Sequence, residues 1–349
     1  MEAIVQSYEN PWSAREADFP WAEDAVTQLK FLLNYAVLAP SSHNAQPWLF
    51  RVAGGELELY VDRTRALPVA DPDDREMMIG CGAALFHLKT AMRHFGFVPV
   101  VHLFPDLDDR DLVAFIRLGE KTSASILEHR LFMAIAHRHT NRMPFDPQPV
   151  PPETLDLLRA AAEEEKATLL ILEDPDQRND LADLIAEGDR RQGADPHFRR
   201  ELAAWVHPNR SHSRDGIPGY AHGMNDILSI TGPLLIRTFD WGRGQAAKDR
   251  QLLDGSPILA VLNTVGDGPS NWLTAGQALD RVLLTASDYG ISASFLNQAL
   301  ELPDLRNQVK ERLGVQGYPQ LVLRLGYGPQ VRATPRRPVH DVISMQRFF

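Results

Sequence analysis

The sequence predicts an α+β fold in which two similar halves are joined in one chain. Residues 79–96 (IGCGAALFHLKTAMRHFG) align without a gap with residues 273–290 (LTAGQALDRVLLTASDYG), and both segments carry apolar residues at helical spacing. Each ends at a glycine, as many helices do, and each precedes a β-rich run, AFIRLG at 114–119 or LVLRLG at 321–326. Two alanine-rich helices can match by chance. The matching strands downstream favour an internal repeat instead.

Each half is expected to begin with a helix that is followed by strands. Residues 25–39 carry an apolar stripe at helical spacing, and residues 152–162 carry a similar one. Strands are expected at 48–52 and 57–61 in the first half and at 168–172 in the second. Helices that alternate with single strands in this way indicate an α+β or α/β sandwich.

The two halves are expected to meet near the proline-rich stretch 144–152, an extended connector, because proline and the residue before it disfavour helix. We place the first half at residues 1–128 and the second at 129–349. A segment of the second half, about residues 190–252, has no counterpart in the first. Its middle, residues 207–225 (HPNRSHSRDGIPGYAHGMN), is expected to be an irregular loop, and its aromatic residues favour a lid.

The composition restricts the class of protein. The 349 residues include 44% hydrophobic and 23% charged residues, which is ordinary for a globular protein. A net charge of −10 argues against nonspecific binding of nucleic acid. No apolar run is long enough to span a membrane, and residues 1–20 lack an apolar signal region, so we expect a cytoplasmic protein. The single Cys81 excludes a disulfide framework, and we expect it in the core rather than as a nucleophile.

The stretch Ala39–Trp48 (APSSHNAQPW) lies between a predicted helix and a predicted strand. Short hydroxyl and amide side chains at such a place can form hydrogen bonds with a planar heterocycle or its polar chain. The flanking prolines would fix the loop. The candidate binding residues are Pro40, Ser41, Ser42 and Asn44. An ordinary turn is the alternative, because Ser, Asn and Pro dominate turns.

Two arginine-rich stretches are candidate anion sites in this acidic chain. In residues 138–142 (RHTNR), Arg138 and Arg142 flank Thr140 and could bind phosphate through charged donors and a hydroxyl. Near the C-terminus, Arg336 and Arg337 could add charge to the same phosphate. The alternatives are a solvated helix end that complements the helix dipole and a solvated basic tail.

These motifs resemble those of the flavin-dependent nitroreductase family. The helix followed by APSSHNAQPW and a strand is similar to a flavin-binding loop of the family, and RHTNR with Phe145 beyond it is similar to its opening arginine–hydroxyl–arginine element. Residues 290–298 (GISASFLNQ) resemble the loop that passes the reactive edge of the flavin. With RALPVADP at 65–72, the best match is the fused, Acg-like branch, over nearly the whole chain.

The resemblance implies a nitroreductase-like fold with a flavin site shared between the two halves. Nitroreductases are usually homodimers with two flavins at the subunit interface. Here the second half would supply phosphate ligands and the flavin-edge loop, and the first half the hydroxyl and amide loop. The implied FMN-binding residues are Pro40, Ser41, Ser42, Asn44, Arg138, Thr140, Arg142, Phe295, Leu296, Asn297, Arg336 and Arg337.

The reciprocal site lacks these elements. Residues 163–167 (EEEKA) hold no Pro-Ser-x-x-Asn loop, and residues 19–24 hold no arginine pair. Because a phosphate would find poor partners there, we predict one FMN per chain. The two halves together would form a monomeric pseudo-dimer.

The resemblance implies an oxidoreductase in which hydride passes from NAD(P)H to FMN and then to a nitroaromatic, a quinone or a similar small acceptor. Because the chemistry belongs to the flavin, no catalytic side chain is assigned. The alternative is a flavin-binding or flavin-sequestering protein, in which Trp205, Tyr220 or Met224 of the segment 190–252 covers the flavin. A scaffold that binds no flavin is a third possibility.

Other motifs are weaker. The pairs His207 with His212 and His137 with His139 could bind a metal, but no cysteine or carboxylate pattern supports them, so no metal site is assigned. Residues 242–247 (GRGQAA) only half resemble a dinucleotide fingerprint, and no well-placed acidic residue follows.

Overall fold

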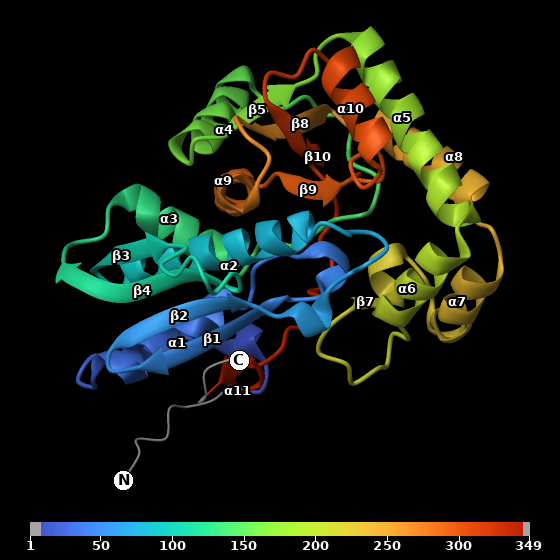
Figure 1. The fold of residues 1–349 in the computed structure, drawn as a ribbon. Coiled ribbons are helices and arrows are strands. Elements are labelled where there is room, and N and C mark those ends of the chain that lie inside the picture. The colour runs from blue at the N-terminus through green and yellow to red at the C-terminus, as the bar shows by residue number, and fades with distance from the viewer. Residues whose placement is uncertain (1–7, 345–349) are drawn as a thin grey trace.

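Two sheets with helices packed between them form the body of the protein (Figure 1). The computed structural model describes residues 8–344. One sheet has the strand order β11-β1-β2-β4-β3, and the other has the order β5-β8-β10-β9. Every pairing in the second sheet is antiparallel, and the first sheet adds one parallel pair, β1 with β11. The predicted α+β class is confirmed. The sequence predicts no signal region in residues 1–20, and residues 1–7 of that stretch lie outside the described range.

The elements of the first half follow the predicted order. Helix α1 begins after Asp24, whose carboxylate accepts the Thr27 N–H at 2.8 Å. The predicted helix at 25–39 and the strands at 48–52, 57–61 and 114–119 are confirmed, with ends that differ by a few residues. The elements are α1 (Ala25–Ala36), β1 (Trp48–Ala53), β2 (Glu56–Val61), α2 (Arg75–His94), β3 (Phe97–Leu103), β4 (Leu112–Lys121) and α3 (Ile126–Ile135).

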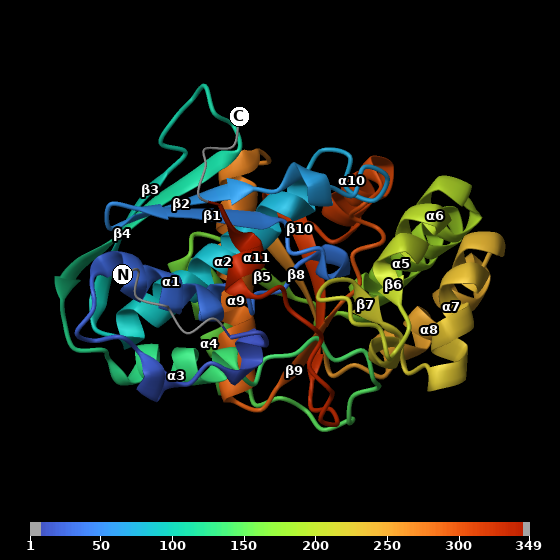
Figure 2. The ribbon, with the colours of Figure 1, turned by 90° about the horizontal axis from the view of Figure 1, so that it is seen from below.

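The second half repeats a helix, strands and a long central helix, and its last segment returns to the first sheet. Strand β11 pairs with β1 there, so the chain after β10 crosses from one half to the other (Figure 2). The predicted boundary at residue 128 falls inside α3, which contacts the central helices of both halves. The elements are α4 (Pro152–Glu164), β5 (Thr168–Ile171), α5 (Pro175–Ala194), β8 (Ile258–Thr264), α9 (Pro269–Asp288), β9 (Ser292–Phe295), α10 (Pro303–Arg312), β10 (Tyr318–Gly326), α11 (Val339–Val342) and β11 (Ile343–Ser344).

The segment 190–252 is largely helical, and its helices lie together on one side of the molecule in both views (Figures 1 and 2). Its middle is irregular, as expected. Its flanks, which gave no clear helical pattern in the sequence, form helices because capping residues such as Asp195 and Asn225 start them and tertiary contacts hold them. The elements are α6 (Pro196–Trp205), β6 (Val206–His207), β7 (Ile217–Pro218), the 3₁₀ turn η5 (Gly219–His222), α7 (Asp226–Thr238) and α8 (Gly242–Asp254).

The two helices that align in the sequence, α2 and α9, cross at their two aligned glycines. A Cβ on Gly82 would lie 2.2 Å from the Leu273 carbonyl oxygen, and a Cβ on Gly276 would lie 2.0 Å from the Ile79 carbonyl oxygen. Only glycine permits so close an approach of the two backbones. The aligned positions therefore form the contact between the two halves.

Polar groups are also buried at this crossing. His87 Nε2 lies 2.8 Å from Asp280 Oδ2, and both side chains are fully buried. Cys81 is buried as well, and its thiol contacts the Pro47 carbonyl oxygen at 3.2 Å. Burial raises the pKa of the Cys81 thiol, which fits the core role predicted for it.

Candidate functional site

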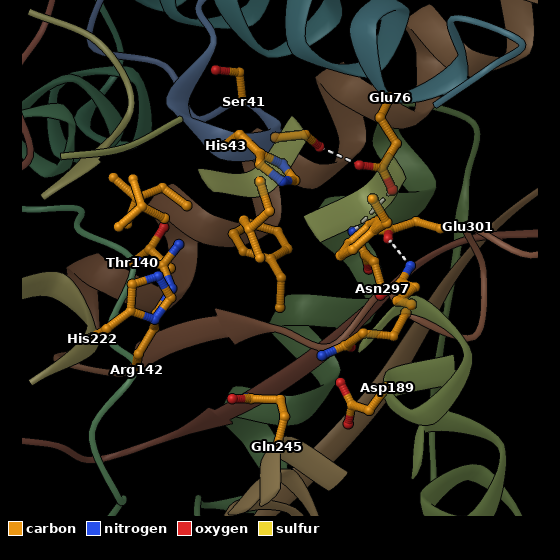
Figure 3. Close-up of a pocket in the computed structure, with 18 of the residues that line it drawn as sticks. Ser41, His43, Glu76, Thr140, Arg142, Asp189, His222, Gln245, Asn297 and Glu301 are labelled. Atoms are coloured by element: carbon orange, nitrogen blue, oxygen red, sulfur yellow. Dashed lines mark hydrogen bonds between the residues drawn. The ribbon is translucent and has the colours of Figure 1, made fainter. Parts of the chain in front are cut away.

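A cavity of about 530 Å³ lies between the first half, the second half and the segment 190–252 (Figure 3). Small-molecule sites typically have volumes of roughly 300–1,000 Å³ and mostly apolar walls with a few polar groups. The walls here include Ile79, Phe198, Trp241 and Phe295 as well as the polar groups described below. The cavity is therefore the candidate site.

The loop of residues 40–47 brings Pro40, Ser41 and Ser42 into the cavity wall. Its backbone is held in a conformation that non-glycine residues rarely adopt, with φ of 52° at His43, 55° at Asn44 and 54° at Gln46. Such a conformation persists only when the surroundings fix it.

Partners from two distant segments fix this loop. The Asn44 amide donates to the carbonyl oxygens of Gly216 at 2.9 Å and Pro335 at 3.0 Å. The Gln46 amide donates to the Arg214 carbonyl oxygen at 2.9 Å, and the Gln46 N–H donates to Ser41 Oγ at 2.8 Å. The geometry of the loop thus depends on the segment 190–252 and on the C-terminal crossing.

Glu76, at the start of α2, is a site residue that sequence reasoning missed. Asp71 positions it by accepting the N–H groups of Glu76 at 3.0 Å and Met77 at 2.9 Å. The Ser42 hydroxyl donates to the Glu76 carboxylate, and Arg75 lies 3.1 Å from it. Burial, and then the charge of Glu76, raise the pKa of Asp71 to about 6. RALPVADP, which contains Asp71, was the one signal near it in the sequence.

Thr140 and Arg142 form the opposite wall from the edge of the second sheet. Thr140 pairs with Ala293, and the Asn141 N–H donates to the Ala293 carbonyl oxygen at 2.8 Å. Arg142 has no hydrogen bond or ion pair with any residue in the described part of the chain, although it is largely enclosed. Burial lowers its pKa to about 10. An enclosed cation without a partner favours an anionic ligand group.

Two histidines lie near Arg142, and both are uncharged at pH 7. Burial, followed by the charge of Arg142, lowers the pKa of His43 to about 4 and that of His222 to about 3. His43 Nε2 is buried and has no hydrogen-bond partner among the described residues. Figure 3 shows His222 beside Arg142 and Thr140, and His43 on the neighbouring wall close to Ser41. This end of the cavity thus combines one charged donor with neutral ring nitrogens.

Other arginines that were predicted as phosphate ligands lie behind the loop and not in the cavity wall. Arg138 and Arg336 each donate to the Leu38 carbonyl oxygen at 3.2 Å, and Arg336 also donates to Asn44 Oδ1 at 2.9 Å. Arg337 donates to the carbonyl oxygens of Gln46, at 3.3 Å, and Asp341. In this structure these side chains brace the loop from outside.

The predicted site residues are therefore only partly brought together. A second cavity of about 440 Å³ is lined by Arg138 and by Thr140, which therefore lines both cavities. Leu296 is 3% exposed and belongs to the core. The predicted residues that line the main cavity are Pro40, Ser41, Ser42, Thr140, Arg142, Phe295 and Asn297, and those that do not are Asn44, Arg138, Leu296, Arg336 and Arg337.

The segment 190–252 forms a wall of the cavity. Met224 and Trp241 line it, whereas Trp205 and Tyr220 do not. Tyr220 donates to the Ala333 carbonyl oxygen at 2.8 Å and so holds the C-terminal segment. Of the aromatic and methionine residues expected to cover the ligand, Met224 is the one in position.

A group of carboxyls at a further side of the cavity was also missed by sequence reasoning. Asp189 and Glu301 line it, and Asp249 lies next to Asp189. Burial and the charge of Asp249 raise the pKa of Asp189 to about 8. Burial and the charge of Glu76 raise the pKa of Glu301 well above its ordinary value. Within residues 8–344, no cluster of three or more His, Cys, Asp or Glu side chains is suited to a metal ion.

Comparisons with known proteins agree with this architecture. The model of the nitroreductase family matches residues 135–327. Over 338 residues, the chain is 33% identical to a Mycobacterium tuberculosis protein named "Putative NAD(P)H nitroreductase Rv3131", covering 95% of this chain and 94% of that one. The chain belongs to the nitroreductase family. It is also 28% identical to "Putative NAD(P)H nitroreductase acg" of the same organism, covering 91% of this chain and 96% of that one.

Solved structures of the family are similar at lower identity. An FMN-dependent nitroreductase from Mycobacterium smegmatis in complex with NADPH is 18% identical, with a TM-score of 0.38, and the match covers 64% of this chain and 96% of that one. A nitroreductase with bound FMN from Bacteroides fragilis is 15% identical, with a TM-score of 0.36, and covers 58% and 90%. The predicted family and its fold are confirmed by the family match. No helix within residues 8–344 has the length and apolar character needed to cross a membrane.

Proposed function

We propose that this chain is an FMN-dependent oxidoreductase of the nitroreductase type, which uses NAD(P)H to reduce a small electron-poor acceptor such as a nitroaromatic or a quinone. Its family supports this, and so do relatives named as NAD(P)H nitroreductases. The observation that carries the proposal is the cavity of about 530 Å³, with hydroxyl groups on one wall and, on another, Arg142, which has no partner among the described residues.

The residues of the cavity fit FMN. Within residues 8–344, neither the enclosed Arg142 cation nor the buried His43 Nε2 has a partner, so both can bind a polar ligand group without losing an existing bond. Ser41, Ser42 and Thr140 offer hydroxyls, and Phe295 and Ile79 offer apolar surface for a planar ring.

When bound, FMN supplies the hydride chemistry. Arg142 would balance negative charge on the ligand, either on a phosphate or on a reduced ring, in an environment where charge interactions are strong. Ser42 would hold its position through its bond to Glu76. Met224 and Trp241 would limit the access of water to the ring.

We also propose one FMN per chain and a monomer in which the two halves act as a fused dimer. The hydroxyl loop belongs to one half and Arg142 to the other, while residues 163–167 line neither of the two cavities described above. The cytoplasmic location expected from the sequence stays a prediction.

A flavin store is the second candidate, and the wall formed by Met224 and Trp241 is the observation that favours it. The absorption spectrum of the purified protein, recorded without oxygen before and after NADPH, separates the two. For the enzyme, we expect bound flavin to bleach with NADPH and to regain its absorbance when a nitroaromatic is added. Bound flavin that neither NADPH nor NADH reduces would support the store. A colourless protein that ignores added FMN would contradict both.

A further inference from the structure

Asp189 of α5 and Asp249 of α8 carry buried carboxyls that lie next to each other. Asp189 is 1% exposed and Asp249 is 3% exposed, and neither forms an ion pair within the described part of the chain, although Lys248 and Arg324 act on Asp249 at longer range. Gln298 donates to Asp249 Oδ2 at 2.8 Å, and Gln245 donates to Asp249 Oδ1 at 2.9 Å. Asp189 Oδ2 accepts no N–H or hydroxyl group of a described residue, its carboxyl shares a hydrogen bond with that of Asp249, and Asp189 lines the cavity (Figure 3). A buried pair of carboxyls must share a proton unless a cation takes its place, because two buried charges of like sign are costly.

Glu301 adds a third carboxyl to this part of the wall. Its carboxylate accepts the Gln192 amide at 2.5 Å, and it likewise has no ion pair with a described residue. Glu76, by contrast, lies 3.1 Å from Arg75. Within residues 8–344, neither Asp189 nor Glu301 forms an ion pair, Arg75 acts on Glu301 only at longer range, and Arg142 lies on the other side of the cavity (Figure 3).

Two aromatic rings line the same part of the cavity. Phe198 and Trp241 have ring centroids 6.4 Å apart, and both rings belong to its wall. Trp241 is placed there by a close contact of backbones: a Cβ on Gly193 would lie 2.4 Å from Gly242 Cα, and a Cβ on Gly242 would lie 2.5 Å from the Asp189 carbonyl oxygen. Aromatic rings and carboxylates together attract organic cations.

From this juxtaposition we propose that the wall at Asp189, Glu301, Phe198 and Trp241 is a subsite for an organic cation, namely a protonated amine carried by the acceptor. The inference rests on the proposed function, because the acceptor would occupy the same cavity as the flavin. The subsite would select basic aromatic acceptors over neutral ones of the same shape. In this proposal, α5 and α8 contribute to the choice of acceptor, a role that binding of the flavin does not require.

Proton release is a signature of such a subsite. The pKa of Asp189, raised to about 8, means that its carboxyl is mostly protonated at pH 7 when no ligand is bound. An ammonium group at 3–4 Å would favour the carboxylate, as about 1 kcal/mol or more of charge interaction at such distances shifts a pKa downward. The charged groups that act on Asp189 and its neighbour Asp249 are Lys248 of α8 and Arg324 of β10, whereas Glu76, Arg75 and Asp71 act on Glu301. Binding of an amine is therefore expected to release protons.

The test compares two probes that differ in charge, para-nitrobenzylamine and para-nitrobenzyl alcohol, by calorimetry on the oxidised protein without reductant. We expect the amine to bind at least about tenfold more tightly than the alcohol. In phosphate and Tris buffers at pH 7, the heats should differ for the amine, because protons are released, and agree for the alcohol. Equal affinities of the two probes, or no proton release, would overturn the subsite.

Asp189→Asn should remove most of the preference for the amine. The matched control is Asp183→Asn, which removes the same charge from the solvent-exposed side of α5, where Asp183 pairs with Arg250. An equal loss in both variants would indicate a general charge effect and contradict the subsite. If Asp189→Asn does not fold, the affinities of the natural protein for the amine and the alcohol still test the subsite. Flavin absorbance of the same samples separates the proposals: a protein without flavin contradicts the proposed function, and a flavoprotein without preference contradicts the subsite alone.

Discussion

The loop between α1 and β1 and the turn between α4 and β5 both connect a helix to a strand, but they are built differently. The first spans residues 37–47, holds three non-glycine residues with positive φ, and is clamped by the segment 190–252 and the C-terminal crossing. The second spans residues 165–167, turns at Lys166 with a φ of 61°, and lines neither of the cavities described here. A positive φ at a non-glycine residue occurs in both connections, so this conformation alone does not create a ligand site.

The central helices α2 and α9, unlike these two connections, are built alike in the two halves. Gly82 of α2 and Gly276 of α9 meet at the crossing and make the same kind of contact from both sides. The two halves are thus equivalent where they pack against each other and different where a ligand would bind. Packing preserves the repeat, whereas the partners of the two connections differ: the segment 190–252 and the C-terminal crossing hold the first loop, and Lys89 and Arg281 pair with Glu165 in the second turn.

The largest effect is expected at Arg142. Arg142→Ala removes the enclosed cation from the main cavity. Because loss of a buried charge partner costs about 2–5 kcal/mol, the variant should retain FMN roughly thirtyfold or more weakly. On the reciprocal side, strand β4 matches β10 in the sequence and ends at the exposed Lys121, so Lys121→Ala is the control. We expect it to leave flavin content unchanged. Absorbance of dialysed protein gives both values.

Two results would break the comparison. Unchanged flavin content in Arg142→Ala would show that the anionic group of the flavin binds elsewhere, with Arg138 and the second cavity as the next candidates. A loss of flavin in Lys121→Ala would show that the reciprocal side also binds it.

A smaller effect is expected at the helix crossing, and it should be similar in both halves. Gly82→Ala and Gly276→Ala each place a methyl group against a backbone carbonyl, so each should lower the free energy of unfolding by about 1–3 kcal/mol. Gly244→Ala in α8, where a Cβ meets nothing within 4 Å, is the control for stability and should gain up to about 1 kcal/mol. Urea denaturation measures all three. A neutral result at either crossing glycine would contradict the close contact.

Much of the scaffold could be predicted because the signals are local. Apolar periodicity placed α1, α2, α4 and α9, and the turn residues of 40–47 marked the loop before β1. Ser41, Ser42, Thr140 and Arg142 line the cavity as the motifs suggested. The helices of the segment 190–252 were not predicted, because their stability comes from packing rather than from composition.

The rest of the site depends on contacts between distant segments. Arg336 lies behind the loop because strand β11 returns to β1 and brings the C-terminal segment against Asn44. Asp189 and Glu301 come from separate elements with no local motif, and the contact of Gly193 with Gly242 helps to enclose the wall. Such burial cannot be read from one sequence, because a carboxylate in a helix is usually solvated.

The most direct test of a single flavin held between unlike halves is the ratio of FMN to protein. The purified chain would be saturated with FMN and desalted, and the flavin released by heat would be quantified against protein concentration, with the molar mass measured by light scattering. We predict one FMN per chain in a monomer. A ratio near two, or a protein that retains no flavin, would contradict the account.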